Sequence, residues 1–448
     1  MKQASFFHSV CWLAVPAALQ SMLQSSFSIV DQLMIGQLGS AEVAGIGLAG
    51  KFISIFSVGT SAVATVAGIM ISQYLGRQSV REVRRNFQIN LMLAMGIAAL
   101  FTAICAGFLR KIMGFYTRDP AVLAVAVKYM SIYTAAFFPA AGAVMLSTLL
   151  RCMEKAYLPL WAGMISMIFN TMLNYILIFG RVGIAPMGVA GAAIATVISQ
   201  GAGFLLILLL YLMNRGSFFG RGKENLERPP FQWRQYGTML FPILICEFMW
   251  SLGENVYAGI YGRMGTAVCA AMTLLNPVQG LMIGALSGLT QAAGIIVGKK
   301  LGAGDRNGAY EAAGKLIRYG LVSSIALSMA VVLLRSSYVT LYRVEEPIKE
   351  LTRQIMLAYA AVAPAKVLNM IVGGGILRSG GRTEYVMVID LVGTWFFGVP
   401  LGLLTAFVFH LTIPWVYFIL SLEECVRFGI SMVVLRRRKW MRCLKSEA

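Results

Sequence analysis

The sequence predicts an all-α integral membrane protein with twelve transmembrane helices arranged in two six-helix bundles. Of its 448 residues, 58% are hydrophobic and only 13% are charged, and the mean hydropathy is +0.73. A soluble protein cannot cover that much apolar surface, because polar residues must still coat its outside. The apolar residues also fall into long runs, and sequence landmarks of the first half return in the second.

Twelve apolar segments follow one another along the chain, most of them joined by short polar connections. Each is long enough for a bilayer crossing, which needs roughly 20 apolar residues. They span residues 10–36, 44–73, 88–109, 120–145, 157–180, 189–213, 238–262, 268–298, 314–335, 347–377, 384–408 and 413–435.

The longest polar stretch, residues 214–236, contains a Pro-Pro pair and divides the apolar segments six and six. We therefore predict an N-terminal six-helix bundle over residues 1–213, a cytoplasmic linker over 214–236 and a C-terminal six-helix bundle over 237–448. With the N-terminus in the cytoplasm, 25 of the 38 Lys and Arg residues fall in cytoplasmic segments and 10 on the opposite side. This bias predicts that both termini are cytoplasmic. The protein is then a multi-pass protein of the plasma (inner) membrane.

The two halves resemble one another at one constant offset in numbering. When Pro16 is placed on Pro242, Gly39 falls on Gly265 in the same register. One residue further in shift, the pair Leu150-Arg151 falls on Leu377-Arg378. Because proline, glycine and arginine landmarks keep one register over four segments, we predict a duplicated six-helix unit in parallel orientation.

Several function classes are disfavoured by the composition. The net charge of +19 comes from basic residues in short loops rather than on one polar face, so we expect no nucleic-acid partner. The seven cysteines form no C-x-x-C pair, and only two histidines occur, so we expect no catalytic metal or other cofactor and no enzyme activity. A channel would need a ring of pore charges or a filter repeat, and neither is present.

Carboxylates inside the apolar segments are the strongest functional signal, because an ionised group near the bilayer centre is costly and normally faces a cavity, a partner or an ion. Six acids lie there: Asp31, Glu247, Glu254, Asp390, Glu423 and Glu424. Asp31 is the only one in the first half. Asn170 and Asn174 lie one helical turn apart and could form a polar cluster with Asp31, although they could also only join helices.

The seventh segment carries Glu247 and Glu254 on one face, with Trp250 and Tyr257 beside them. Such a stripe suits a lipophilic cation through charge and cation–π contact. One of the two glutamates could instead only balance Lys366 or Arg263.

Lys366 is a buried cation that requires a carboxylate partner. Glu247, Glu254 and Asp390 are the candidates, and the sequence leaves the choice between them open. Glu423 and Arg427, spaced i, i+4, are interpreted as a structural ion pair. The predicted substrate cavity is lined by Gln20, Gln24, Glu247, Trp250, Glu254, Tyr257 and Lys366.

Several motifs together resemble the multidrug and toxic compound extrusion (MATE) family. The first segment contains DQLMIGQLGSAEVAG, and the fifth contains NTMLNYILIFG followed by GVAGAAIATVISQ. The seventh reads FPILICEFMWSLGENVYAGIYGRMGT, and ISQYLGR in the first half is echoed by VGKKLGAGD in the second. The tail of the tenth segment reads GGGILRSGGRT, and the eleventh segment contains DLVGTWFFGVPLG.

The resemblance implies two bundles related by a pseudo-two-fold axis along the membrane normal, with a V-shaped central cavity and alternating access. It also implies ion coupling at the residue that matches Asp31, with Asn170 and Asn174 at the matching polar pair. Some members carry aspartate at the position of Asn174, and the asparagine here removes that charge. Glu247 and Asp390 match acids of one bacterial branch.

The function predicted from these observations is export of cationic or amphipathic organic molecules by antiport against H⁺ or Na⁺. The coupling residues are Asp31, Asn170, Asn174, Glu247 and Asp390, with Na⁺, if used, at Asp31 or at Glu247 and Asp390. The protein is expected to act as a monomer in the lipid bilayer. The alternative is a flippase of the same fold superfamily for a lipid-linked saccharide or other polar lipid, and recognition of its pyrophosphate would need a basic cavity.

Overall fold

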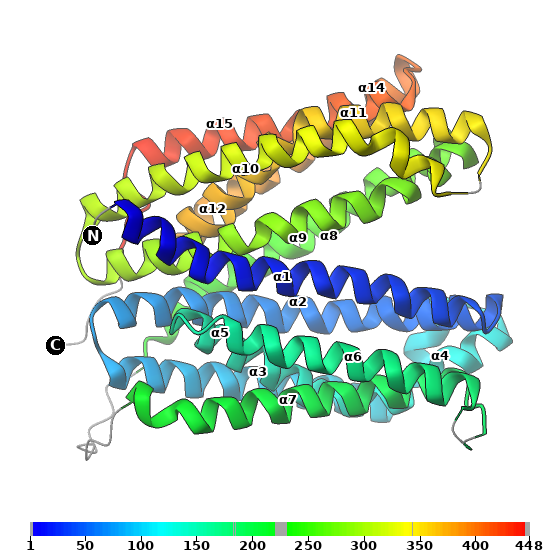
Figure 1. Cartoon of the computed structure of the whole chain (residues 1–448), viewed down its shortest axis with the longest axis horizontal. Coiled ribbons are helices and arrows are strands. Elements are labelled where there is room, and N and C mark those ends of the chain that lie inside the picture. The colour runs from blue at the N-terminus through cyan, green and yellow to red at the C-terminus, as the bar shows by residue number, and fades with distance from the viewer. Residues whose placement is uncertain (1–2, 182, 184, 220–230, 343, 444–448) are drawn as a thin grey trace. The chain divides into compact units, whose positions relative to one another are not determined.

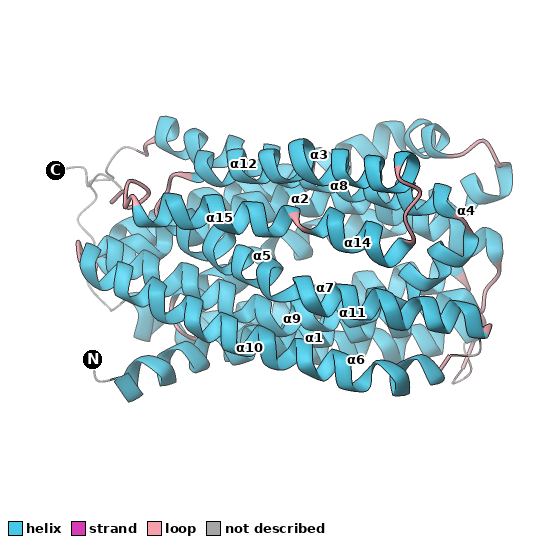
Figure 2. Ribbon diagram, turned by 90° about the horizontal axis from the view of Figure 1, so that it is seen from above, coloured by secondary structure: helices cyan, strands magenta, loops and turns pink. Residues whose placement is uncertain are grey.

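The computed structural model describes residues 3–181, 183, 185–219, 231–342 and 344–443 (Figure 1). Within these residues the chain forms helices joined by turns and loops, without a strand (Figure 2). The all-α prediction is therefore confirmed.

Each predicted segment corresponds to one helix or to one run of consecutive helical pieces. The first half forms α1 (Gln3–Gly36), α2 (Ser40–Gly76), α3 (Val80–Tyr116), α4 (Pro120–Tyr133), the 3₁₀ turn η1 (Thr134–Ala136), α5 (Phe137–Cys152), α6 (Tyr157–Phe179) and α7 (Val189–Phe219). The second half begins with α8 (Trp233–Met264), α9 (Thr266–Gly302), α10 (Arg306–Thr340) and α11 (Glu346–Asn369). It ends with η2 (Met370–Leu377), α12 (Thr383–Leu391), η3 (Val392–Gly398), α13 (Val399–Leu403), η4 (Leu404–Val408), α14 (Ile413–Ser421) and α15 (Glu423–Arg436).

Eleven of these helical runs, among the described residues, are long and apolar enough to cross a membrane. The twelfth predicted segment, 413–435, is present as α14 and α15, which are separated at Leu422. Neither piece alone has the length of a crossing, and α15 starts with the charged pair Glu423 and Glu424. Together the two pieces complete the predicted set of twelve.

The helix boundaries repeat with the offset found in the sequence. Helices α2 and α9 both contain 37 residues, and their first and last residues keep the register that places Pro16 on Pro242. Each follows a glycine with positive φ, Gly39 at +139° and Gly265 at +130°, where a side chain would be strained. The backbone therefore preserves the duplication more completely than the side chains do.

The described chain contains two compact units. Unit 1 comprises Met1–Met22, Ser72–Gln78 and Pro229–Ala448, and unit 2 comprises Leu23–Ile71 and Ser79–Arg228. The start of α1 and the end of α2 thus group with the second half. The predicted division at residues 214–236 stays a prediction, since residues 220–230 lie outside the described part of the chain.

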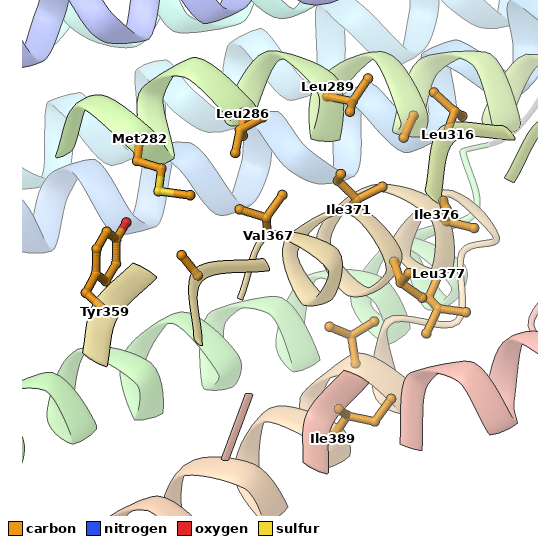
Figure 3. Packing of buried hydrophobic residues seen from close by; sticks show 14 of the residues in the cluster. Met282, Leu286, Leu289, Leu316, Tyr359, Val367, Ile371, Ile376, Leu377 and Ile389 are labelled. Carbon is orange, nitrogen blue, oxygen red and sulfur yellow. The ribbon is translucent and has the colours of Figure 1, made fainter. Parts of the chain in front are cut away.

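Unit 1 has a continuous apolar core in which α9, α10 and α11 pack together (Figure 3). Met282, Leu286 and Leu289 of α9 face Val367 and Ile371 of the α11–η2 run, as Figure 3 shows. Unit 2 has an aromatic core, in which the ring centroids of Phe56 and Phe137 lie 4.5 Å apart. Such packing of apolar side chains holds the helices that carry the polar groups described below.

Three segments of the second half are π-helical: η2, η3 and η4. A π-helix widens the turn and is found mostly as short insertions in α-helices, frequently at functional sites. The segment η3 begins two residues after Asp390 and contains two glycines, Gly393 and Gly398. These glycines lie against charged side chains of α15.

Candidate functional site

Asp31 lies in the last third of α1 and contacts α6 within unit 2. The Asn174 side-chain amide donates a hydrogen bond to the Asp31 carboxylate, with a distance of 2.9 Å between Nδ2 and Oδ1. Asn174 is buried, with 3% of its surface exposed. The structure therefore brings together the acid and the amide that the sequence analysis placed in one cluster.

Asn170 extends this cluster to α7. Its Oδ1 accepts a hydrogen bond from Asn174 at 3.2 Å, and its Nδ2 lies 3.0 Å from the Ser199 hydroxyl. With its amide turned over, Asn170 instead donates to both Asp31 oxygens at 3.2 Å and accepts from Ser199. In this second orientation both Asp31 oxygens accept from Asn170, but the Asn170 nitrogen lies 3.2 Å from the Asn174 nitrogen, which then no longer donates to Asn170. We call Asp31, Asn170, Asn174 and Ser199 the Asp31 cluster.

The Asp31 cluster contains one acid and no base. Among the residues that the structure describes, Asp31 takes part in no ion pair. Its carboxylate is held by neutral amide donors, which fix its orientation without cancelling its charge. Such a group can take up a proton, or bind a hard cation through its own and neighbouring oxygens.

The second half carries a different arrangement, centred on Arg427 of α15. The Arg427 guanidinium lies 3.3 Å from Glu423, 3.8 Å from Glu424 and 3.9 Å from Asp390 of α12. These side chains are nearly inaccessible, with exposures of 5% for Arg427, 6% for Glu423 and 9% for Glu424. The predicted Glu423–Arg427 pair is confirmed, and it belongs to a larger network.

Neutral donors also contact the two glutamates. The Tyr257 hydroxyl of α8 donates to Glu423 Oε2 at 2.6 Å, and Asn369 of α11 donates to Glu424 Oε2 at 2.9 Å. Arg427 also donates to the Thr394 hydroxyl in η3. Buried charges are tolerated when they are paired and hydrogen-bonded in this way.

Through Cys246 the network extends to the N-terminal part of α8. The Cys246 thiol donates to Asp390 Oδ2 at 2.8 Å and accepts from the Arg378 guanidinium at 3.4 Å. Arg378 in turn pairs with Glu247 at 3.2 Å. We call Cys246, Glu247, Tyr257, Lys366, Asn369, Arg378, Asp390, Thr394, Glu423, Glu424 and Arg427 the C-half network.

Glycines of η3 leave room for this network. A Cβ atom on Gly393 would overlap the Arg427 side chain, and one on Gly398 would overlap Glu423 and the Tyr257 hydroxyl. A Cβ atom on Gly253 of α8 would overlap Thr394. The close approach of α8, η3 and α15 therefore depends on residues without side chains.

A cavity of about 290 Å³ lies beside the C-half network in unit 1. Its lining is rich in tyrosines and carboxylates, and its polar members are Glu254, Tyr257, Tyr261, Thr273, Asn276, Gln279, Tyr359, Lys366, Tyr417, Ser421, Glu423 and Glu424. We call it the C-half cavity. Glu254 is exposed, and among the described residues it makes no ion pair or hydrogen bond. An aromatic pocket with an open carboxylate suits an organic ammonium ion.

The predicted substrate residues separate into two groups. Glu254, Tyr257 and Lys366 line the C-half cavity, as described above. Glu247 instead pairs with Arg378, and Gln20, Gln24 and Trp250 do not belong to the described lining of this cavity. Gln24 and Trp250 are exposed on their helices, and Gln20 is half-buried.

The expected partners of Lys366 need correction. Its ammonium lies 4.0 Å from Glu424, a residue that was not among the candidates Glu247, Glu254 and Asp390. Asp390 is held by Cys246 and Arg427 instead. The adjacent acids Glu423 and Glu424 in an apolar segment were the available signal, but a local pair with Arg427 explains them equally well in the sequence.

A family sequence model, related protein sequences and solved structures all indicate the same family. The sequence model of the MatE family matches residues 16–176 and again residues 242–404, so that the two matches start at the prolines that mark the repeat. The protein named probable multidrug resistance protein NorM from Rhizobium meliloti is 26% identical over 416 residues, which cover 90% of this chain and 86% of the relative. Human multidrug and toxin extrusion protein 1 is 23% identical over 409 residues, or 88% of this chain and 68% of that protein.

Solved structures of low sequence identity share the fold. A crystal structure of a MATE transporter in a bent conformation superposes with a TM-score of 0.86 at 16% identity, covering 96% of this chain and 94% of that one. A variant of the Vibrio cholerae MATE transporter VcmN gives a TM-score of 0.87 at 16% identity, covering 98% and 99%. The chain therefore adopts the MATE transporter fold and belongs to the MATE family of multidrug efflux transporters.

Proposed function

We propose that this protein exports cationic or amphipathic organic molecules in exchange for H⁺ or Na⁺, with Asp31 as the coupling acid. The observation that carries the proposal is the state of Asp31: a carboxylate in a membrane helix, held by Asn174 and without an ion-pair partner among the described residues. A charge that the protein does not neutralise itself is available to a transported ion.

The coupling follows from competition for one charge. The ionised Asp31 favours a cationic substrate nearby, and uptake of H⁺ or Na⁺ neutralises it and weakens that attraction. Ion and substrate then favour different conformations, so that the binding of one promotes the release of the other. Asn170 and Asn174 keep the carboxylate oriented in both states. We place the protein, as a monomer, in the plasma membrane with both termini in the cytoplasm, in line with its Lys and Arg distribution.

The alternative function, a flippase for a lipid-linked saccharide, is less well supported. A pyrophosphate group requires a basic cavity, whereas the described lining of the C-half cavity contains three glutamates and one lysine. This composition favours a cation over an anion.

The proposal is tested by dye efflux from proteoliposomes under imposed Na⁺ or H⁺ gradients. We expect gradient-driven efflux by the wild type and its loss in Asp31→Asn. Glu311→Gln is the matched control, because Glu311 is an exposed acid of α10 outside both polar sites. Dye movement that ignores the gradient, or full activity of Asp31→Asn beside an active control, overturns the proposed mechanism.

A further inference from the structure

The C-half network and the C-half cavity together contain more carboxylates than cations. The five acids are Glu247, Glu254, Asp390, Glu423 and Glu424, and the three bases are Lys366, Arg378 and Arg427. The three bases differ in how firmly they are held. That difference gives Lys366 a role that the proposed transport cycle does not use.

The two arginines are fixed by several contacts each. Arg427 contacts three carboxylates and the Thr394 hydroxyl, and Arg378 contacts Glu247 and Cys246. Among the described residues Lys366 has a single ion-pair contact, with 4.0 Å between Nζ and Glu424 Oε1. Its side chain is 28% exposed and borders the C-half cavity. A lysine is a compact charge on a flexible stem, and here it is the base of the network that borders the open space.

Glu424 presents two different oxygens. Oε2 is held by Asn369 at 2.9 Å and lies 3.8 Å from Arg427, so this side of the carboxylate is built into the network. Oε1 is directed to Lys366, with the cavity beside it. Lys366 and Asn369 lie three residues apart on α11, so one face of this helix supplies both contacts. Without the ammonium, Oε1 would be a charged oxygen bordering a polar cavity of about 290 Å³.

We propose that the Lys366 ammonium is a resident cation of the C-half cavity, which occupies at Glu424 the place that a free Na⁺ ion or a small organic ammonium would otherwise take. A tethered group binds at a high effective concentration, so a free ion of ordinary affinity does not displace it. Glu254 is then the acid of the cavity that remains open to an organic cation. Lys366 thereby makes the C-half cavity selective against inorganic cations.

The experiment removes the Lys366 ammonium by mutation and supplies a free cation from solution in its place. The purified full-length chain is studied in detergent, with Asp31→Asn in every sample so that cation binding at the Asp31 cluster does not contribute. We expect the melting temperature of Asp31→Asn/Lys366→Ala to rise saturably with millimolar ethylammonium, and also with Na⁺, at constant ionic strength. Asp31→Asn with its lysine intact should not respond to Na⁺, and it should respond less to ethylammonium, because only Glu254 then remains open to that ion. Because no transport is measured, failure here is distinguishable from failure of the proposed export.

Two controls locate the effect at Glu424. Addition of Glu424→Gln should abolish the response to Na⁺, and Asp31→Asn/Lys366→Arg should stay unresponsive to Na⁺ because it keeps a tethered charge. Equal responses to Na⁺ with and without Lys366, or a response to Na⁺ that persists after Glu424→Gln, overturn the proposal. If Lys366→Ala does not fold in any of these buffers, the variant that also carries Glu424→Gln tests the proposal, because it removes the charge that Lys366 would otherwise neutralise. Recovery of a monodisperse protein supports the resident cation, and failure to recover overturns it.

Discussion

The two halves of this chain have corresponding helices but different electrostatic arrangements. In the first half, Asp31 is an acid held only by neutral groups, with Asn174 at 2.9 Å. In the second half, Glu423, Glu424 and Asp390 surround Arg427, and Lys366 approaches from α11. In the register of the repeat Asp31 falls on Tyr257, whose hydroxyl donates to Glu423 at 2.6 Å.

This contrast separates two uses of a buried carboxylate. An acid with its own base contributes to packing, and its removal leaves the partner unpaired in a place where water is scarce. An acid without a base contributes little to folding but can exchange a cation with solution. The comparison therefore predicts that stability depends on the second half and ion coupling on the first.

The largest effect on stability is expected from Arg427→Met, which leaves three carboxylates without their shared base. Loss of one partner from a buried ion pair typically costs about 3–5 kcal/mol. Thermal unfolding in detergent should show a large fall in melting temperature, whereas Asp31→Asn should be as stable as the wild type. A stable Arg427→Met, or an unstable Asp31→Asn, would break the comparison.

Tyr257→Phe tests the neutral donors of the same network. It removes the hydroxyl that donates to Glu423, and a hydrogen bond to a charged group contributes about 1.5–3 kcal/mol. The control is Tyr261→Phe, a second tyrosine of the C-half cavity, which should cost much less. Equal losses in the two variants, measured by thermal unfolding, would contradict a specific role for the Tyr257 hydroxyl.

Gly393→Ala tests whether the network depends on the close approach of η3 and α15. The added methyl would overlap the Arg427 side chain, and overpacking of this kind costs about 1–3 kcal/mol. Gly429→Ala is the matched control on α15, because a Cβ there meets no atom within 4 Å. The control should be neutral or slightly stabilising by helix propensity. Identical unfolding curves for both variants would argue against the packing described here.

The smallest effect concerns a helix cap between the apolar segments. The Asp305 side chain caps α10 by accepting from the Gly308 amide at 2.8 Å, whereas Ser79, its counterpart before α3, makes no such bond. Asp305→Ala should cost about 1 kcal/mol and Ser79→Ala less. The Gly308 amide and the nearby Lys300 ammonium hold the pKa of Asp305 below its ordinary value of 3.8.

A lowered carboxyl pKa gives a stabilising contribution that is complete above pH 3.8 and disappears as the pH falls through the native value. The difference in unfolding free energy between wild type and Asp305→Ala should therefore be constant near neutrality and shrink in acid. A difference that grows on acidification would exclude the cap as its cause.

Local and periodic features were predictable from the sequence, but tertiary partners were predictable only in part. The helices follow from apolar runs, and the contact between Asp31 and Asn174 follows from two rare polar positions in such runs. The Lys366–Glu424 contact was missed, because it depends on how α11 packs against α15, and no local spacing encodes that packing. Arg378 falls just outside the predicted tenth segment, 347–377, yet it is half-buried against Glu247 because η2 continues the helix to it.

The π-helical segment η2 explains why the repeat changes its register. Helices α4 and α11 start in the common register, at Pro120 and Glu346, but Leu150-Arg151 corresponds to Leu377-Arg378, one position further along. The second half thus has one residue more than the first within this helix, and the wide turn of η2 lies just before the displaced pair. A π turn absorbs one extra residue without lengthening the helix. The one-residue difference between the halves therefore lies within a helix rather than in a loop, and Arg378, which follows η2, contacts Glu247.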